Sequence, residues 1–295
     1  MTTAIAEEFE RHRARLFGLA YRMLGSADEA EDTVQDASLR FSGADRARIE
    51  HTGPWLAKVV TNLCLNRLTT ARFRREQYVG IWLPEPVLTS DGTLGPLESA
   101  EQRDAVSMTL LVLLERLTPS ERAVYVLREA FGHGHREIAA LLDLTEANCR
   151  QLHRRAVQRA AAPQGRFEPD PERQAELVTS FVTAARDGDP ACLEKLLAAD
   201  VIWWGDGGGK VRVTRRPVEG REKVVRFLVG GARKVTADLD FTVAEINGAN
   251  GLAAWAGDRL VGVVTFELRY DLITRLRAVM NPDKLDFVRR QLGQP

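Results

Sequence analysis

Residues 118–159 are predicted to form three short helices separated by tight breaks, and this arrangement constrains the chain more than any other stretch. Thr118 and Glu121 form a capping box around a proline at the first helical position, which marks where the first helix begins. The glycines in Gly132–Gly134 end this helix, and a second helix is expected from about His135 to Leu142. A tight turn then leads into a third helix, so the stretch predicts a helix–turn–helix.

The third helix combines one apolar face with an otherwise polar and basic surface. Cys149, Leu152 and Ala156 are spaced three and four residues apart, as in a helix that docks on a partner helix. The other faces carry amide, imidazole and guanidinium groups suited to base edges and phosphates: Asn148, Arg150, Gln151, His153 and Arg154. We therefore expect a DNA recognition helix. The alternative is an ordinary amphipathic helix with a solvated basic face.

The overall charge is neutral, with 41 basic and 41 acidic side chains in 295 residues. Neutrality argues against a DNA-binding chain, but the distribution argues for one, because residues 58–75 contain five cations and no acid. The apolar content of 44% and the charged content of 28% are typical of soluble globular protein, and the length favours two or more domains. Cys64, Cys149 and Cys192 are far apart and odd in number, which favours a reducing compartment. With no signal-peptide core and no apolar run of membrane-spanning length, we expect a cytoplasmic protein.

Residues 1–77 are predicted to be entirely helical, and one of their helices is acidic. Ser26 and Glu29 form a capping box before this helix, whose buried side runs from Ala30 to Phe41. Its remaining surface is acidic or amidic and offers a contact surface: Asp28, Glu31, Asp32, Gln35 and Asp36. The residues alone leave open that this is a solvated charged face.

A further helix opens at Pro54 and carries a second candidate nucleic-acid face. Lys58, Asn62 and Asn66 recur every four residues and so share one side of the helix. The polar surface continues with four arginines: Arg67, Arg72, Arg74 and Arg75. Asn and Arg can bond base edges, and Arg can stack on unpaired bases or hold phosphate. The alternative is that Asn62 caps a broken helix and the arginines are solvated.

Residues 77–99 contain three prolines and three glycines, which excludes a long helix or a central strand. This linker nevertheless contains apolar side chains, including Trp82 and Leu83, so we expect the stretch Trp82–Pro86 to pack against a folded surface. A helix is expected to resume from Ala100 to Leu117, and a second linker is expected at Pro163–Pro171.

The remainder of the chain reads as an α+β domain, with helices first and an antiparallel meander after them. Helices are expected at Glu172–Arg186, Pro190–Ala199, Glu219–Leu228 and Asp283–Leu292. Strands are expected at Val201–Trp204, Val211–Arg215, Asp238–Ile246, Leu252–Ala256, Gly262–Tyr270 and Leu272–Met280.

The sequence contains candidates for three other kinds of site. The glycine loop Gly205–Lys210 departs from the phosphate-loop pattern and is better read as a contact loop. Cys149 and His153 lie on different faces of one helix, so we expect no metal site. An enzyme pocket in the last domain would draw on Trp203, Trp204, Trp255, Phe266 and Tyr270, with Asp206, Asp258 and Tyr270 as candidate reacting groups. No spacing singles these residues out, so we expect packing aromatics, no catalytic residue and no cofactor.

Taken together, the segments resemble the extracytoplasmic-function (ECF) sigma factors of RNA polymerase, specifically the subgroup with a C-terminal SnoaL-like domain, the sigma J type. AEDTVQDASLRF at Ala30–Phe41 resembles sigma region 2.2, which implies docking of the acidic helix on the β′ clamp helices of core polymerase. PWLAKVVTNLCLNRL and ARFRRE resemble regions 2.3 to 2.4, which implies that the second face opens and reads the −10 element, with Asn62 at a pocket for a flipped base. Thr118–Arg159 resembles region 4, which implies reading of the −35 element and contact with the β flap.

Two departures from the family pattern occur in region 4. Asp143 stands where glycine is usual, although Asp also tolerates a left-handed turn, and Cys149 stands where valine is usual. The marks of the subgroup are WLPEP at Trp82–Pro86, DGGGK at Asp206–Lys210 and NPDKL at Asn281–Leu285.

The resemblance implies two all-α sigma domains and a SnoaL/NTF2-like cone domain that regulates the sigma factor in cis. That domain is expected to pack against the linker and against regions 2 and 4, through Trp82, Leu83, Pro84, Asp206, Lys210, Asn281, Asp283 and Lys284. The expected boundaries are 1–77 for region 2, 78–99 for the linker, 100–163 for region 4, 164–171 for the second linker and 172–295 for the SnoaL-like domain. We expect a monomer, partnered by core polymerase and promoter DNA, and no membrane association. The alternatives are a last domain that senses a small molecule or catalyses, and a stand-alone helix–turn–helix repressor.

Overall fold

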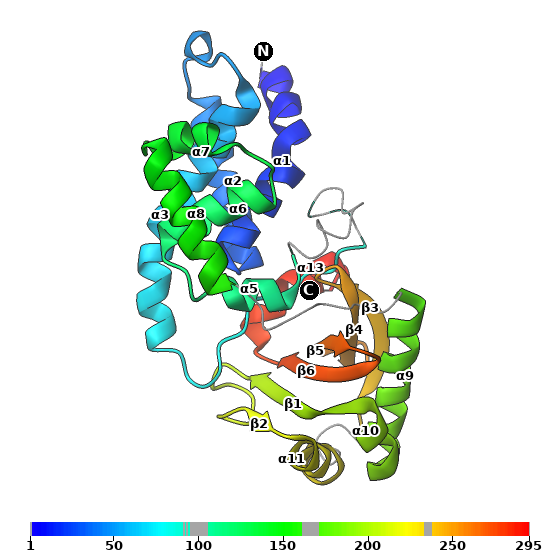
Figure 1. Ribbon diagram of the computed structural model, residues 1–295. Helices are drawn as coiled ribbons and strands as arrows, with labels where there is room; N and C mark the ends of the chain where they lie inside the picture. The colour runs from blue at the N-terminus through cyan, green and yellow to red at the C-terminus, as the bar shows by residue number, and fades with distance from the viewer. Residues whose placement is uncertain are drawn as a thin grey trace. The chain divides into compact units, whose positions relative to one another are not determined.

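The computed structural model describes residues 2–90, 92, 94, 106–160, 171–232 and 238–294. The chain divides into two compact units, and the division does not follow the chain in order (Figure 1). The first unit comprises Met1–Gln77 and Asp91–Ala162, and the second comprises Tyr78–Ser90 and Pro163–Pro295. The first half of the linker therefore belongs to the C-terminal unit.

The first unit is all helical, and three helices form its N-terminal part: α1 (Thr2–Leu24), α2 (Ala27–Ser42) and α3 (Thr52–Glu76), with a short 3-10 helix at Arg46–Arg48. Gly25 ends α1 with a φ of +67°, and the Ser26 hydroxyl accepts the Glu29 amide at the start of α2. The buried side predicted for α2, from Ala30 to Phe41, is buried, and it packs with buried apolar residues of α1 such as Phe9. Periodicity alone was sufficient to locate this core.

Four shorter helices complete the first unit: α5 (Met108–Leu114), α6 (Pro119–Glu129), α7 (His135–Leu142) and α8 (Glu146–Ala160). Thr118 and Glu121 form the predicted capping box at α6. Asp143 ends α7 in the left-handed conformation, with a φ of +55°. A single helix was expected at Ala100–Leu117. Residues 100–105 lie outside the described residues, and within the remainder of this range the helix is the shorter α5. At the end of α7, Leu141 is buried and Leu142 is half-buried.

The second unit is built on one six-stranded sheet with the order β2-β1-β6-β5-β4-β3. Its strands are β1 (Leu197–Asp206), β2 (Val218–Glu219), β3 (Asp240–Ile246), β4 (Ala249–Ala256), β5 (Arg259–Arg269) and β6 (Leu272–Val279). The run from β3 to β6 is the predicted antiparallel meander, and β1 joins it in parallel beside β6. The helices are α9 (Pro171–Asp187), α10 (Pro190–Leu196), α11 (Arg221–Arg226), a π-helix at Phe227–Ala232, a 3-10 helix at Pro282–Lys284 and α13 (Asp286–Gln291).

The core of this unit lies between the sheet and its covering helices. Figure 1 shows α9 lying across the sheet on the side of β4, with α10 and α11 near β1. Phe181 of α9 meets Phe266 of β5 edge to face, with ring centroids 5.4 Å apart. Trp203 of β1 packs on Phe227 in the same core. The α+β class is therefore as predicted.

Some predicted elements of this unit were wrong. No strand forms at Val211–Arg215, because the chain turns tightly through Gly208 and Gly209, both with positive φ, and it pairs with β1 only later, at Val218 and Glu219. The second helix ends at Leu196 and not at Ala199, because β1 begins directly at Leu197. The last helix is interrupted at Leu285, which separates the 3-10 turn from α13. The linker expected at Pro163–Pro171 lies outside the described residues up to position 170.

Candidate functional sites

The predicted acidic face lies along α2, on the side away from its buried residues. All five of its side chains are half-buried or exposed: Asp28, Glu31, Asp32, Gln35 and Asp36. Leu39 follows on the same helix, one turn after Gln35 and Asp36, and its side chain is 68% exposed. Sequence reasoning missed Leu39, although an apolar residue outside the buried helical period was a detectable signal. A large apolar side chain beside a row of acids is typical of a contact surface rather than of a solvated one.

Arg67 of α3 is bound to this acidic face. Its Nη2 lies 2.7 Å from Oδ2 of Asp36, and its Nη1 lies 3.7 Å from Oδ2 of Asp32. Arg13 of α1 lies 3.6 Å from Glu31 in the same way. The sequence placed Arg67 among the nucleic-acid residues, whereas in the structure it fixes the carboxylates of the neighbouring helix.

The other residues of the second polar face lie on α3. Lys58 is half-buried, and its Nζ donates to Oδ1 of Asp143 at 2.8 Å and to the Ala140 carbonyl at 3.3 Å. Asn62 is half-buried and Asn66 is exposed, one and two turns further along the helix. The side chains of Arg72, Arg74 and Arg75 lie outside the described residues.

Helix α8, the predicted recognition helix, presents four of its five predicted side chains to solvent: Asn148, Arg150, Gln151 and Arg154. Its N-terminus is capped by Thr145, whose hydroxyl accepts the Asn148 amide, and Arg150 pairs with Glu146 one turn back. Cys149 and Ala156 are fully buried, as the predicted docking face requires. Burial, aided by Glu146, raises the pKa of the Cys149 thiol, so this cysteine is a packing residue rather than a reactive one.

His153 lies differently from the other four residues. Its Nε2 lies 2.7 Å from Oε1 of Glu129 in α6, and its ring meets His135 edge to face at 5.2 Å. Nε2 of His135 is buried with no hydrogen-bond partner among the described residues. Burial lowers the pKa of His135, and the nearby His153, Arg128 and Arg150 lower it further. The two histidines therefore connect α6, α7 and α8 and hold α8 in position.

The second unit contains a buried polar cluster centred on Asp206, at the end of β1. Asp206 is fully buried, and its carboxylate accepts four hydrogen bonds. Oδ1 accepts the Tyr78 hydroxyl and the Gly208 amide, and Oδ2 accepts the Leu83 amide at 2.8 Å and Lys284 Nζ at 2.7 Å. Two of these donors come from the linker, so the carboxylate joins the linker to the sheet.

Lys284 is the cation of this cluster and is only 7% exposed. Its ammonium also donates to the Leu83 carbonyl and lies over the rings of Tyr78 and Trp82, 4.6 Å and 4.2 Å from their centroids. An ammonium between a carboxylate and two aromatic faces is stabilised by both charge pairing and cation–π attraction. Burial raises the pKa of the Tyr78 hydroxyl, and its bond to Asp206 raises it further. Tyr78 therefore acts as a neutral donor, a role that the sequence did not reveal.

Asn281 and the glycine loop complete the cluster. Asn281 donates from Nδ2 to the Tyr78 hydroxyl at 2.8 Å and accepts the Asp283 amide. Gly208 has a φ of +60°, and a Cβ there would lie 2.4 Å from the Asn281 side chain, so only glycine fits. Lys210 and Asp283 form an exposed ion pair at 2.6 Å beside the buried cluster. The DGGGK and NPDKL motifs are thus in contact with each other, and both contact the linker at Tyr78 or Leu83.

The remainder of the bound linker continues across the edge of the sheet. Val87 exchanges hydrogen bonds with Asn247, Leu88 exchanges them with Gln291, and the Thr89 amide donates to the Glu245 carbonyl. Leu83 and Val87 are buried, and Pro84 is buried between them. These contacts confirm the prediction that the WLPEP stretch packs against a folded surface.

The aromatic residues considered for an enzyme pocket do not gather in one place. Trp203 and Phe266 belong to the core of the second unit. Trp204 lies under the Arg277 guanidinium, and Trp255 donates to the Thr242 hydroxyl. Tyr270 is 75% exposed at the turn between β5 and β6, and Asp258 is exposed at another turn. These residues provide no common cavity for a reaction.

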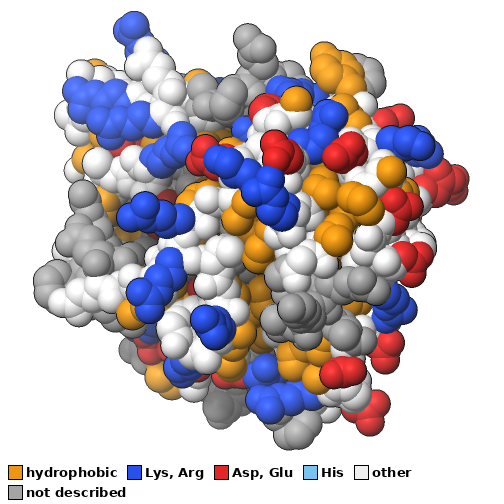
Figure 2. Space-filling view, turned by 90° about the horizontal axis from the view of Figure 1, so that it is seen from below, with side chains coloured by type: hydrophobic (Ala, Val, Ile, Leu, Met, Phe, Trp, Pro, Cys, Tyr) orange, Lys and Arg blue, Asp and Glu red, His pale blue; other side chains and the backbone are white. Residues whose placement is uncertain are grey.

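Three further properties concern the surface, metal sites and membrane-spanning helices. Figure 2 shows Lys and Arg side chains spread over one face of the molecule, with acidic and apolar side chains among them. In the described ranges, no group of three or more His, Cys, Asp or Glu side chains is placed to hold a metal ion. No helix within the described part of the chain is long and apolar enough to span a bilayer.

Comparison with known proteins places these sites in a family context. Residues 9–74 match the family description Sigma-70 region 2, and residues 107–159 match Sigma-70, region 4. The chain is 35% identical over 291 residues to the ECF RNA polymerase sigma factor SigJ of Mycobacterium tuberculosis, covering 94% of this chain and 92% of the relative. It is 30% identical over 292 residues to SigI of the same species, named as a probable ECF RNA polymerase sigma factor, covering 98% and 97% of the two chains. The crystal structure of M. tuberculosis SigJ matches 98% of this chain and 99% of its own, with 32% identity and a TM-score of 0.75.

Proposed function

Because the chain belongs to the ECF family of RNA polymerase sigma factors, which direct promoter-specific transcription initiation, we propose a specific role for each of the polar surfaces described above. The observation that carries the proposal is that the candidate contact residues on α2, α3 and α8, apart from Arg75, fall within the two matched sigma regions, and none of them is among the buried core residues. Such a factor acts with core polymerase in the cytoplasm and on promoter DNA.

The acidic face of α2 is the docking surface for core polymerase, at the β′ clamp helices. Its carboxylates suit a basic partner surface, and Leu39 supplies the apolar contact at the edge. Arg67 neutralises part of the face and holds Asp36 and Asp32 in fixed positions before the partner arrives. Region 4 makes a second contact with polymerase, at the β flap.

The face of α3 that carries Lys58, Asn62 and Asn66 opens and reads the −10 element. The half-buried Asn62 lies between Lys58 and the exposed Asn66 on this face. The Asn62 amide can form hydrogen bonds with the edge of a base that leaves the duplex, while the Lys58 ammonium binds the DNA phosphates. Arg72, Arg74 and Arg75 extend the positive charge along the same helix and contact phosphates.

The exposed side of α8 reads the −35 element in the major groove. Asn148, Arg150 and Gln151 at its N-terminal end reach base edges, and Arg154 reaches phosphate. His153 is a positioning residue, because its bond to Glu129 of α6 sets the orientation of the helix.

The C-terminal unit regulates the sigma factor in cis by holding the linker. Thirteen residues, Tyr78–Ser90, are taken into that unit, and the Asp206–Lys284 cluster binds their backbone at Leu83. Release of this segment has a free-energy cost. A partner that needs a free linker can bind only the molecules in which the linker is released, so its apparent affinity is the intrinsic affinity multiplied by the fraction of such molecules. The unit performs this role without catalysis, since the one buried carboxylate of the cluster is fully engaged by four donors.

Transcription from a library of random promoter sequences with core polymerase tests the proposal. Sequencing of the transcripts is expected to show start sites with two enriched upstream elements when the full chain is added. Gln151→Ala should change or lose the upstream element, while Gln158→Ala, at another exposed glutamine of α8, should leave it unchanged. Transcripts without enriched elements would contradict a promoter-reading role.

A further inference from the structure

We infer that the C-terminal unit binds the phosphates of duplex DNA through a basic loop, residues 210–216, which follows the glycine turn at the end of β1. The inference goes beyond the roles assigned above, although the choice of DNA as the partner rests on the assignment of α8 to the −35 element. Residues 210–216 contain four cations and no acid. Guanidinium groups bind phosphate oxygens in a bidentate manner, so such a cluster suits a nucleic-acid backbone.

The three arginines of the basic loop are open to a partner. Arg212, Arg215 and Arg216 are exposed, and none of them has an ion pair with another described residue. Other exposed arginines of the same unit are paired with acidic side chains: Arg173, Arg186 and Arg269. Exposed cations that gather without acidic neighbours produce a local positive potential, which attracts an anionic partner.

The backbone of the basic loop is held in place from its start to its end. At the start, Lys210 forms its ion pair with Asp283. In the middle, Val213 packs on the last residues of β1, so that a Cβ at Gly205 would lie 3.2 Å from the Val213 Cβ. After the end, Val218 pairs with β1. Because an ordered loop loses little conformational entropy when it binds, its arginines are positioned in advance for contact with phosphates.

The chain connection keeps the basic loop near any duplex that α8 binds. Helix α8 ends at Ala160 and α9 begins at Pro171, so the connection spans at most about 40 Å even when fully extended. A covalent connection of this length gives the second unit a high effective concentration at the same duplex. Contacts to phosphate with a dissociation constant in the range of roughly 10⁻⁴–10⁻⁶ M, as in non-specific DNA binding, are then strong enough to form.

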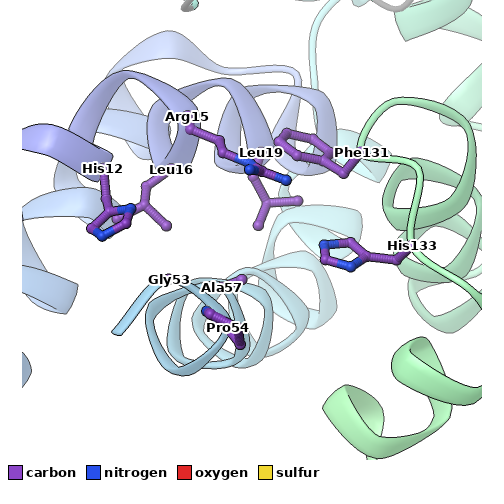
Figure 3. A pocket seen from close by; sticks show the side chains of 9 residues that line it. All are labelled: His12, Arg15, Leu16, Leu19, Gly53, Pro54, Ala57, Phe131 and His133. Carbon is purple, nitrogen blue, oxygen red and sulfur yellow. The ribbon is translucent and has the colours of Figure 1, made fainter. Parts of the chain in front are cut away.

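A cavity in the first unit is a weaker candidate for an anion site, although His12, Arg15 and His133 line it (Figure 3). Its volume of about 170 Å³ is below the roughly 300 Å³ at which sites for small-molecule ligands begin. Figure 3 shows Arg15 beside Phe131, and its guanidinium carbon lies 5.6 Å from the ring centroid. Arg15 is therefore engaged by an aromatic ring, whereas the three arginines of the basic loop have no ion pair in the described part of the chain.

Salt-dependent binding of the full chain to a DNA duplex of random sequence tests the inference. Fluorescence anisotropy gives the binding constant K at each salt concentration. Loss of one phosphate contact lowers the slope of log K against log salt concentration by about 0.9. Replacement of Arg212, Arg215 and Arg216 together by glutamine should therefore lower the slope by about 2.7. At a salt concentration of about 50 mM, the same variant should bind at least about tenfold more weakly.

A matched variant controls for the total charge. Replacement of Arg173, Arg186 and Arg269 by glutamine removes the same charge from the same unit, but acidic side chains already pair with these arginines. The slope should therefore change by less than about 1. Replacement of the three loop arginines by lysine keeps the positive charge and should retain most of the slope. Thermal unfolding shows whether each variant folds, and if the triple glutamine variant does not, the three single variants should each lower the slope by about 0.9.

The inference would be overturned if the wild type does not bind the duplex at low salt, or if the loop variant and the matched variant have equal slopes. A loss of binding confined to single-stranded RNA of the same length would also contradict it, because the partner would then be RNA. Since a random duplex carries no fixed promoter element, this binding does not depend on sequence reading by α3 and α8. An intact loop contribution without enriched promoter elements in the transcripts would count against the proposed function alone.

Discussion

Lys284 Nζ lies 2.7 Å from Oδ2 of Asp206, and this pair joins two segments that are 78 positions apart in the sequence. Both side chains are buried, and the pair is surrounded by the linker residues Tyr78, Trp82 and Leu83. A charge pair taken out of water is stable only when further hydrogen bonds satisfy it, and here the linker backbone supplies them. The linker is thus an integral part of the buried cluster and not a passive connection.

Replacement of one member of the pair should release the linker. Asp206→Asn leaves the Lys284 ammonium buried without a counter-ion, which is expected to cost about 3–5 kcal/mol of the stability of the cluster. Limited proteolysis within residues 78–90 should become faster, and the apparent affinity for core polymerase should rise, because the bound linker no longer competes. The double variant Asp206→Asn with Lys284→Met removes both charges and should recover much of the lost stability. Unchanged proteolysis in the single variant would count against linker capture.

The exposed ion pair Lys210–Asp283, beside the buried pair, should contribute far less to stability. Lys210 and Asp283 are more than half exposed, so Lys210→Gln should change the free energy of unfolding by no more than about 1 kcal/mol. If the same variant alters transcription, the loop also has a contact role separate from holding the linker. If both Lys210→Gln and Asp206→Asn leave transcription unchanged, the loop has no regulatory role.

Helix–turn–helix stability should depend on pH through His135. Burial lowers the pKa of His135 in the folded state, so the unfolded chain binds a proton at a higher pH than the folded one does. Stability therefore falls as pH drops below about 6.5, the ordinary pKa of histidine. Thermal unfolding at a series of pH values should show this loss for the wild type and a smaller loss for His135→Gln. Parallel pH profiles for the two proteins would exclude His135 as the cause.

The acidic face of α2 predicts charge-sensitive polymerase binding. Asp32→Lys reverses an exposed charge on that face and should weaken binding to core polymerase by about tenfold or more, most clearly at low salt. Glu10→Lys reverses an exposed acid on α1, outside the face, and serves as the matched control. Equal binding of the two variants would remove α2 from the polymerase interface.

The helical parts of this chain were largely predictable because their signals are local. Periodicity located the buried residues of α2 and α8, and the capping box at Thr118 located the start of α6. The order of helices and strands in the second unit was also readable, since each strand carries its own apolar run. The strand expected at Val211–Arg215 was misplaced, because two glycines with positive φ fold the chain back before β2, and two helix boundaries were also wrong.

The partners of the polar groups were less predictable, because they depend on contacts between distant residues. Nothing local to Tyr78 indicates that its hydroxyl meets Asp206, which lies 128 positions later. Periodicity placed Arg67 and His153 on polar faces but could not show that neighbouring helices supply Asp36 and Glu129 to bind them. Composition and motif identify such groups as candidates, and only the fold decides which of them remain available for nucleic acid.

Amide hydrogen exchange of the linker tests the central claim most directly. The amides of Leu83, Val87, Leu88 and Thr89 all donate to groups in the C-terminal unit. Linker capture predicts that these amides are protected in the free full-length protein and exchange much faster in the transcribing holoenzyme, while amides in the centre of the sheet stay protected. Equal protection of the four amides in both states, during active transcription, would contradict the account.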